Sequence, residues 1–248
     1  MRILNGNITQ CEDCESVMEY DINDIIPVVA CPKCGKLVKA KMPTPVSVSV
    51  FDDMSWDEIC NMFPKAFMPG ITKNITLKNG EQYAVQVTDR KDGLMLSFKD
   101  LYGHEDGGGM PINSEEDYKR KYEDCDLRKW LNSEFLNLLP DDLVKHIVPA
   151  EIVSDGKTLK DKIFIPSEIE VFGKDEYGRC REGEQLELYA DWHNRISGYV
   201  DGQYGRWWWL RTKSKAGGSS FCGVYDCGYA GYNYVSDSLG VRPHFLIK

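Results

Sequence analysis

The spacing of apolar residues changes several times along the chain, and each change predicts a different element. In DLRKWLNSEFLNLLP (126–140), apolar side chains recur every three or four residues, which predicts one helix that ends before Pro140. SWDEIC predicts a short helix with Ser55 at the N-cap and Glu58 three residues later. DDLVKHIVP (141–149) predicts a second, shorter helix.

Short runs rich in β-branched and aromatic residues predict strands elsewhere. EQYAVQVTD (81–89) and LMLSF (94–98) flank the turn-forming segment RKDG and predict a hairpin. KIFIPSEIEVFG predicts a buried strand that breaks at Pro166 before a helical turn, while GRWWWLRT and VRPHFLI predict an aromatic strand and a closing strand. Early helices and late short strands, without βαβ alternation, predict an α+β domain whose C-terminal half is mostly irregular strand and loop.

Two C-x2-C pairs near the N-terminus predict a zinc site. CEDC and CPKC place Cys11, Cys14, Cys31 and Cys34 in two knuckles separated by 16 residues, and Gly35 suits the tight backbone after the second knuckle. Four thiolates at this spacing bind one tetrahedral Zn²⁺ and leave no position open for catalysis, so we expect a structural zinc ribbon. A module this short would take much of its folding free energy from the metal.

The segment after the second knuckle predicts a boundary between two parts of the chain. Pro43 and Pro45 in KMPTPVSVSVF favour an extended path, which predicts a linker or the first strand of the next domain. We therefore predict a zinc ribbon over 1–42, a linker over 43–50 and a larger domain over 51–248.

The composition disfavours a nucleic-acid or membrane partner. The net charge is −9, of which residues 1–45 contribute −1, so neither part offers the basic surface that phosphate neutralisation needs. Hydrophobic residues make up 42% of the chain, enough for a packed core, yet no apolar run approaches the roughly 20 residues of a membrane span. The first residues do not resemble a secretory signal, so we expect cytoplasmic synthesis. Nine cysteines, an odd number, disfavour a disulfide framework.

Familiar catalytic motifs are not found in the sequence. His104, His146, His193 and His244 lie outside metal and nucleophile motifs, and the chain has no G-x-S-x-G, phosphate-binding loop or H-E-x-x-H sequence. The glycine-rich GHEDGGG (103–109) could cradle an anion, but it lacks the Lys-Ser/Thr ending and predicts a flexible surface loop. We therefore expect a protein that is not an enzyme.

The segment FCGVYDCGYAGYNYVSDSLGV (221–241) has the composition of a recognition surface. Its four tyrosines stand among Gly, Asp, Asn and Ser, and it contains no Lys, Arg, Glu, Gln, Met or Trp. Tyr offers a large, rigid contact at low entropic cost, and small polar residues add adaptable hydrogen bonds. The same tyrosines could instead pack on twisted strands. In the run Trp207–Trp209, strand alternation turns at least one indole outward, although the block is typical of a core strand.

Several blocks of the chain together resemble a family of domains of unknown function from bacteria and their phages. The blocks are SWDEIC, ITLKNGEQYAVQV, WLNSEFLNLLPDDLVKHIVP, DKIFIPSEIEVFG, GEQLELY, WWLR and the closing FCGV…GVRPHF. Several members of that family are variable proteins of diversity-generating retroelements. The resemblance covers residues 51–248 and implies a C-type-lectin-like fold related to formylglycine-generating enzymes, with the zinc ribbon as an accessory.

The resemblance also implies which residues of the tail contact a ligand. In the retroelement system, an error-prone reverse transcriptase rewrites adenines, and Asn codons of the A-A-pyrimidine type mark the variable positions. Nine residues match the family's fixed positions, and we call them the frame residues: Phe221, Cys222, Val224, Gly228, Ala230, Ser236, Ser238, Gly240 and Val241. The ten variable positions, called here the predicted ligand residues, are Tyr225, Asp226, Cys227, Tyr229, Gly231, Tyr232, Asn233, Tyr234, Asp237 and Leu239.

The chain departs from the family's pattern at three places. Gly223 stands where a second Cys is common, Val235 stands where Ala is common, and GVRP is similar to the non-diversified branch. These departures leave active diversification open and do not alter the implied fold.

The resulting hypothesis is a non-catalytic binding protein that presents a Tyr-rich surface to a protein or glycan, beside a zinc ribbon that stabilises the chain or docks on a partner. A phage-encoded copy would be carried on the virion. Two alternatives stay open. One is an enzyme of the formylglycine-generating type, which needs a copper-binding pair such as Cys222 and Cys227 in a cleft, and the other is a nucleic-acid binder that uses the ribbon.

Overall fold

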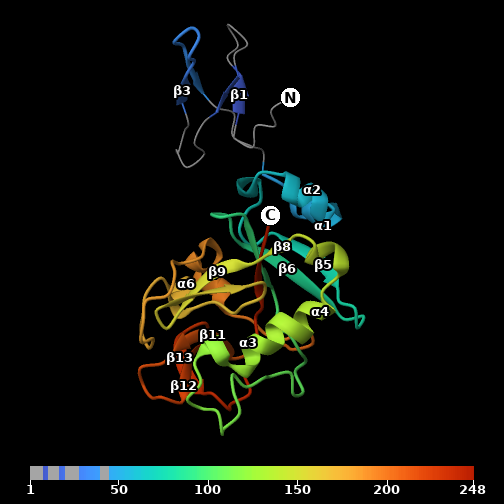
Figure 1. Cartoon of the computed structure of the whole chain (residues 1–248). Coiled ribbons are helices and arrows are strands. Elements are labelled where there is room, and N and C mark those ends of the chain that lie inside the picture. The colour runs from blue at the N-terminus through green and yellow to red at the C-terminus, as the bar shows by residue number, and fades with distance from the viewer. Residues whose placement is uncertain (1–7, 11–16, 20–27, 40–44) are drawn as a thin grey trace. The chain divides into compact units, whose positions relative to one another are not determined.

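The computed structural model divides the chain into two compact units, Met1–Thr44 and Pro45–Lys248 (Figure 1). The residues that it describes are 8–10, 17–19, 28–39 and 45–248. Within these ranges, no helix has both the length and the apolar character needed to cross a bilayer.

The smaller unit contains two short antiparallel hairpins in its described residues. β1 (Ile8–Gln10) pairs with β2 (Val17–Glu19), and β3 (Val28–Ala30) pairs with β4 (Leu37–Lys39). In the sequence, each predicted zinc knuckle therefore falls between the two paired strands of one hairpin.

The larger unit begins with a helix where the sequence predicts a linker or a strand. α1 (Val48–Asp53) overlaps the predicted linker over 43–50. Its only buried side chain is Phe51, whose ring lies 5.1 Å from that of Phe67 between centroids. Valine-rich segments favour strands, but burial of this one aromatic ring in the core outweighs the local preference.

A five-stranded antiparallel sheet of order β5-β6-β7-β14-β8 forms the centre of the larger unit. The strands are β5 (Thr72–Thr76), β6 (Gln82–Asp89), β7 (Leu94–Phe98), β14 (His244–Ile247) and β8 (Ile147–Val148). The predicted hairpin and the predicted closing strand are confirmed. Because β14 lies between β7 and β8, the last residues of the chain complete the sheet.

The residues with helical spacing over 126–140 form one continuous helical segment, as predicted. It consists of α3 (Asp126–Trp130), a π-helical turn η3 (Leu131–Phe135) and α4 (Leu136–Leu138). Phe135 is fully buried and packs edge-on against Phe98 of β7, with ring centroids 5.5 Å apart. The apolar stripe thus covers one face of the central sheet.

The other short helices lie around this sheet. The capping box predicted for α2 (Trp56–Asn61) is present: the Glu58 amide donates to Ser55 Oγ, and the Ser55 amide donates to Glu58 Oε2. The remaining helical turns are η1 (Pro64–Ala66), η2 (Tyr122–Asp124), α5 (Asp141–Val144), η4 (Glu187–Ala190) and η5 (Trp192–Arg195).

The segment predicted as a buried strand broken at Pro166 is only partly strand. Phe164 makes an isolated bridge with His244, and the residues around it are buried. The predicted helical turn after the proline is α6 (Glu168–Phe172), which ends at Gly173 with a φ of 73°. A separate hairpin of β9 (Ala150–Ser154) and β10 (Lys157–Asp161) precedes it.

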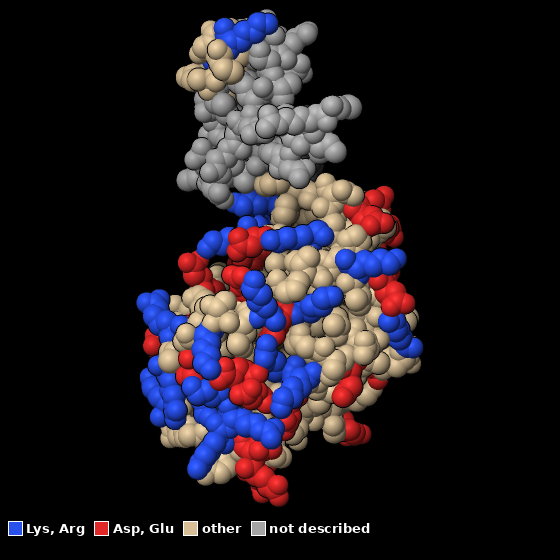
Figure 2. Space-filling model, in the orientation of Figure 1, with Lys and Arg blue, Asp and Glu red and all other residues tan. Residues whose placement is uncertain are grey.

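The larger unit is therefore mixed α and β, mostly sheet with few helices, which confirms the predicted α+β class. On the face shown in Figure 2, Lys and Arg side chains are interspersed with Asp and Glu side chains.

His244 is part of the core and titrates far from its usual range. The carbonyl oxygen of Arg242 can only accept, so His244 Nδ1 donates to it at 2.9 Å, and Nε2 accepts from the Tyr189 hydroxyl at 3.0 Å. Burial lowers the pKa of His244 to about 3. His244 is therefore neutral in the folded protein. Below pH ~6.5 it takes up a proton only in the unfolded chain, so the free energy of unfolding falls as the pH falls.

We expect this linkage to remove about 1 kcal/mol of folding free energy between pH 7.5 and pH 5.5. In His244→Gln, the pH dependence over this interval should be weaker by that amount, whatever the absolute stability of the variant. Urea titrations followed by Trp fluorescence at the two pH values measure the difference. An identical pH dependence in wild type and variant would contradict the assignment.

Candidate functional site

The C-terminal sheet carries four of the ten predicted ligand residues, and the turns on either side of its last strand carry the other six. It has the order β11-β12-β13, with β11 (Trp208–Lys213), β12 (Ser220–Val224) and β13 (Ala230–Tyr234) in antiparallel register. β11 and β12 are buried throughout, whereas β13 alternates toward its end between exposed and half-buried residues. Figure 1 shows this sheet at the end of the larger unit away from α1 and α2. The sheet therefore offers an edge strand to solvent.

Frame residues and predicted ligand residues separate by burial. Seven of the nine frame residues are buried: Phe221, Cys222, Val224, Gly228, Ala230, Gly240 and Val241. Of the other two, Ser236 is half-buried and Ser238 is exposed. Among the tyrosines, Tyr229 is 71%, Tyr234 65% and Tyr232 41% exposed. The tail thus holds its frame in the core and turns three large amphipathic rings outward.

The other predicted ligand residues are spread over the rim of the same surface. Asp226 and Cys227 are exposed, and Tyr225, Asn233, Asp237 and Leu239 are half-buried. Gly231 does not reach the surface, because a β-carbon there would lie 2.0 Å from the Tyr225 ring. Gly231 therefore leaves the space that the Tyr225 ring occupies, and it is not a contact residue.

Five predicted ligand residues line one groove with a volume of about 580 Å³. They are Tyr225, Tyr232, Asn233, Tyr234 and Asp237. The groove is completed by Tyr177, Trp207 and Ser220, which were not predicted as ligand residues. We call these eight residues the Tyr-rich groove.

Two of the added residues fix the aromatic walls of the Tyr-rich groove. Trp207 stacks on Tyr225 with ring centroids 4.1 Å apart and an interplanar angle of 24°, and Tyr177 packs on Tyr232 at 5.4 Å. Trp207 is the predicted outward indole, and it precedes β11, in which Trp208 and Trp209 are both fully buried. No comparable signal identifies Tyr177, which lies in an irregular segment after α6.

The family of the larger unit follows from a comparison with known families. A family model described as "Domain of unknown function (DUF6273)" matches residues 94–248. The chain belongs to the DUF6273 family. No curated protein and no solved structure matches the chain. The matched region includes all of the Tyr-rich groove and confirms that the larger unit belongs to a family of unknown function, as the resemblance implies.

A buried charge network supports the groove from inside the DUF6273 domain. The carboxylate of Glu168 accepts hydrogen bonds from the amides of Tyr177 and Gly178 at 2.9 and 2.8 Å. Burial raises the pKa of Glu168, and these backbone hydrogen bonds oppose the increase. Tyr177 is therefore held at the groove by a carboxylate that lies wholly inside the domain.

Arg211 ties the same region to β11. Its guanidinium makes two hydrogen bonds to the Glu170 carboxylate, at 2.5 and 2.6 Å, and one to the carbonyl oxygen of Ile165. The Arg211 side chain is fully buried. Glu182, which is also buried, accepts from the Thr212 hydroxyl at 2.7 Å, and burial raises the pKa of its carboxyl group. The network joins α6 to β11, the strand that begins directly after Trp207.

The two cysteines of the copper alternative lie in different environments. Cys222 is buried in β12, whereas Cys227 is exposed, and they form no disulfide bond. Burial raises the pKa of the Cys222 thiol well above its usual range, which opposes formation of the thiolate that binds metal. Among the described residues, no group of three or more His, Cys, Asp or Glu side chains could hold a metal ion.

Only half of the predicted zinc site can be placed. Cys11 and Cys14 lie outside the described residues, while Cys31 is buried and Cys34 is exposed. The Cys31–Cys34 turn is tight: the Gly35 amide donates to the Cys31 carbonyl oxygen at 2.8 Å, and Gly35 has a φ of 72°. A left-handed glycine directly after the second thiolate fits the knuckle that a zinc ribbon needs.

Proposed function

We propose that this DUF6273 protein is a non-catalytic binding protein that recognises a macromolecular ligand, a protein or a glycan, through the Tyr-rich groove. One observation carries the proposal: predicted ligand residues from β13 and its flanking turns converge on a single groove, while the frame residues between them are buried. Nine of the ten predicted ligand residues are exposed or half-buried, and seven of the nine frame residues are buried.

The chemistry of the groove suits binding better than catalysis. Stacked and tilted aromatic rings provide rigid contact area, and Asn233 and Asp237 add hydrogen-bonding groups at its edge. The Asn233 Nδ2 lies 3.4 Å from an Asp237 carboxylate oxygen, so these two polar groups hold each other in place. Rings held by their neighbours lose little conformational entropy when a ligand binds.

The C-type-lectin-like fold and the retroelement origin of the tail belong to this proposal. The mostly buried frame and the mostly outward variable positions support the retroelement origin, because a diversified tail must change its surface without disturbing its core. Cys227, Asp226 and Tyr229 lie on exposed backbone between β12 and β13, where substitution costs little stability.

We expect the double variant Tyr232→Ala/Tyr234→Ala to bind its ligand at least tenfold more weakly than wild type, because central aromatic contacts dominate binding energy. Printed glycan and peptide arrays, probed with the labelled full-length protein, provide the ligand for titration. Tyr118→Ala is a matched control, since Tyr118 is 41% exposed, as Tyr232 is, and lines no part of the groove. Equal binding by wild type and double variant, or no saturable binding on either array, would contradict the proposal.

A further inference from the structure

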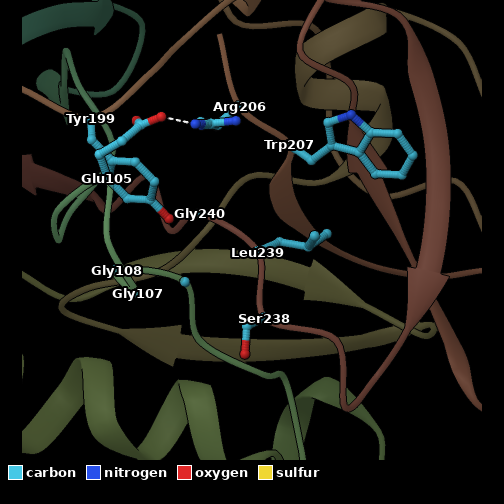
Figure 3. A pocket seen from close by; sticks show the side chains of 10 residues that line it. Glu105, Gly107, Gly108, Tyr199, Arg206, Trp207, Ser238, Leu239 and Gly240 are labelled. Carbon is cyan, nitrogen blue, oxygen red and sulfur yellow. Dashed lines mark ion pairs between the residues drawn. The ribbon is translucent and has the colours of Figure 1, made fainter. Parts of the chain in front are cut away.

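A second hollow adjoins the Tyr-rich groove and shares Trp207 with it. It has a volume of about 400 Å³ and is lined by the glycine-rich loop, Tyr199, Arg206, Ser238 and Leu239 (Figure 3). This volume falls within the range of roughly 300–1,000 Å³ typical of small-molecule sites. Only one of the predicted ligand residues, Leu239, lines it, so the hollow is a separate feature of the domain.

The glycine-rich loop that forms one wall is held in place, although the sequence predicts a flexible loop. The Met110 amide donates to the Leu239 carbonyl oxygen at 2.8 Å, and the Leu239 amide donates to that of Met110 at 3.3 Å. A β-carbon on Gly109 would lie 2.7 Å from the Ser238 carbonyl oxygen. The glycines therefore allow close packing of two backbones, and the hollow is formed before any ligand arrives.

Tyr199 and Glu105 provide the polar groups on one side of the hollow. The residue is 7% exposed, and Figure 3 shows its ring reaching into the hollow with the hydroxyl toward Gly240. Within 45–248, the structure records no hydrogen bond to this hydroxyl. The hydroxyl is open to the hollow, whereas the Glu105 Oε2 atom of the same lining is buried without a hydrogen-bond partner. Buried polar atoms are nearly always hydrogen-bonded, so this oxygen points to a donor supplied by a ligand or by water.

The charges beside Tyr199 cancel each other. The guanidinium of Arg206 forms an ion pair with the Glu105 carboxylate at the rim of the hollow. A phosphate would be repelled by the Glu105 carboxylate, and an ammonium group would be repelled by the Arg206 guanidinium, so neither kind of ion gains a net attraction. The site favours a neutral ligand that both donates and accepts hydrogen bonds.

The opposite side of the hollow is apolar. Trp207 and Leu239 line this side, and Figure 3 shows Arg206 between Tyr199 and Trp207, with the indole extending away from Tyr199. Trp207 is 36% exposed, and its stacking on Tyr225 fixes the ring. A rigid indole is suited to the C–H face of a sugar ring, while Tyr199, Ser238 and Arg206 present groups of the kind that sugar hydroxyls bond.

We propose that this hollow is a binding subsite for a neutral monosaccharide unit. The hydroxyls of the sugar would bond Tyr199, Ser238 and Arg206, and one face of its ring would lie on Trp207. The assignment is independent of the Tyr-rich groove, because a sugar could occupy the hollow whether or not the groove binds a ligand.

A panel of neutral methyl glycosides, titrated into the full-length protein by saturation-transfer NMR, tests the assignment. We expect saturable binding of at least one glycoside, weakened about tenfold by Tyr199→Phe, which removes only the hydroxyl. Tyr234→Ala, which alters the groove but not the hollow, should bind the glycoside as wild type does. Thermal melting of Tyr199→Phe verifies that the variant is folded.

Three results would overturn the assignment. The first is that no glycoside shows saturable binding. Binding of Asn- or Gln-containing tripeptides in place of glycosides would count as this same result. The second is unchanged affinity in Tyr199→Phe. The third is weakening by Tyr234→Ala with none by Tyr199→Phe, which would place the sugar in the Tyr-rich groove and leave the proposed function standing.

Discussion

Arg211→Met is expected to lower the free energy of unfolding of the DUF6273 domain by about 3–5 kcal/mol. The substitution preserves most of the side-chain volume but removes the charge that faces Glu170 in the core, where the Arg211 side chain is wholly buried. Glu170 would then retain a buried carboxylate without its two guanidinium hydrogen bonds. Removing one partner of a buried ion pair is far more costly than removing the pair itself.

Urea unfolding followed by Trp fluorescence measures this loss, because all six tryptophans lie in the larger unit. Lys91→Met is the matched control, since Lys91 and Glu184 form an ion pair whose side chains are 64% and 80% exposed. We expect that control to change stability by less than about 1 kcal/mol. The double variant Arg211→Met/Glu170→Met should recover only part of the loss, because the buried Ser167 amide also donates to Glu170 Oε2 and would lose this acceptor. A single variant as stable as the control would show that the buried pair does not hold α6 against β11.

Local patterns in the sequence were enough to predict elements whose signals lie within a few residues. The capping box at Ser55, the hairpin over 81–98 and the helical stripe over 126–140 all follow from side-chain periodicity or turn chemistry. One indole of Trp207–Trp209 is outward, as predicted, but strand alternation is not the cause, because Trp207 precedes β11 and the adjacent Trp208 and Trp209 are both buried.

Features that depend on distant contacts were not predictable in the same way. Glu170 and Arg211 are 41 residues apart, and neither residue type alone indicates a buried pair. The α1 helix depends on the packing of Phe51 against Phe67, which overrides the extended preference of its valines. Tyr177 reaches the Tyr-rich groove because Glu168 holds its amide, a contact that no periodicity encodes.

The zinc ribbon is predicted by the sequence, but part of it lies outside the described residues. We propose that Cys11, Cys14, Cys31 and Cys34 hold one Zn²⁺ in the smaller unit. Hairpins as short as β3–β4 bury little apolar surface, so in this proposal the metal would contribute most of the folding free energy. The tight turn, in which the Gly35 amide donates to the Cys31 carbonyl oxygen, supports this assignment because it brings the two ends of the second knuckle together.

Metal analysis of the full-length protein should give one zinc per chain, and removal of zinc with a chelator should unfold the smaller unit. Hydrogen exchange over residues 28–39 should then reach the rate of an unfolded peptide, while Trp fluorescence of the larger unit stays unchanged, because every tryptophan lies beyond residue 45. Cys34→Ser should lose the zinc, whereas Cys227→Ser, at an equally exposed cysteine of the larger unit, should retain it. A folded, protected smaller unit without metal would refute the site, and zinc loss in both variants would place the metal elsewhere in the chain.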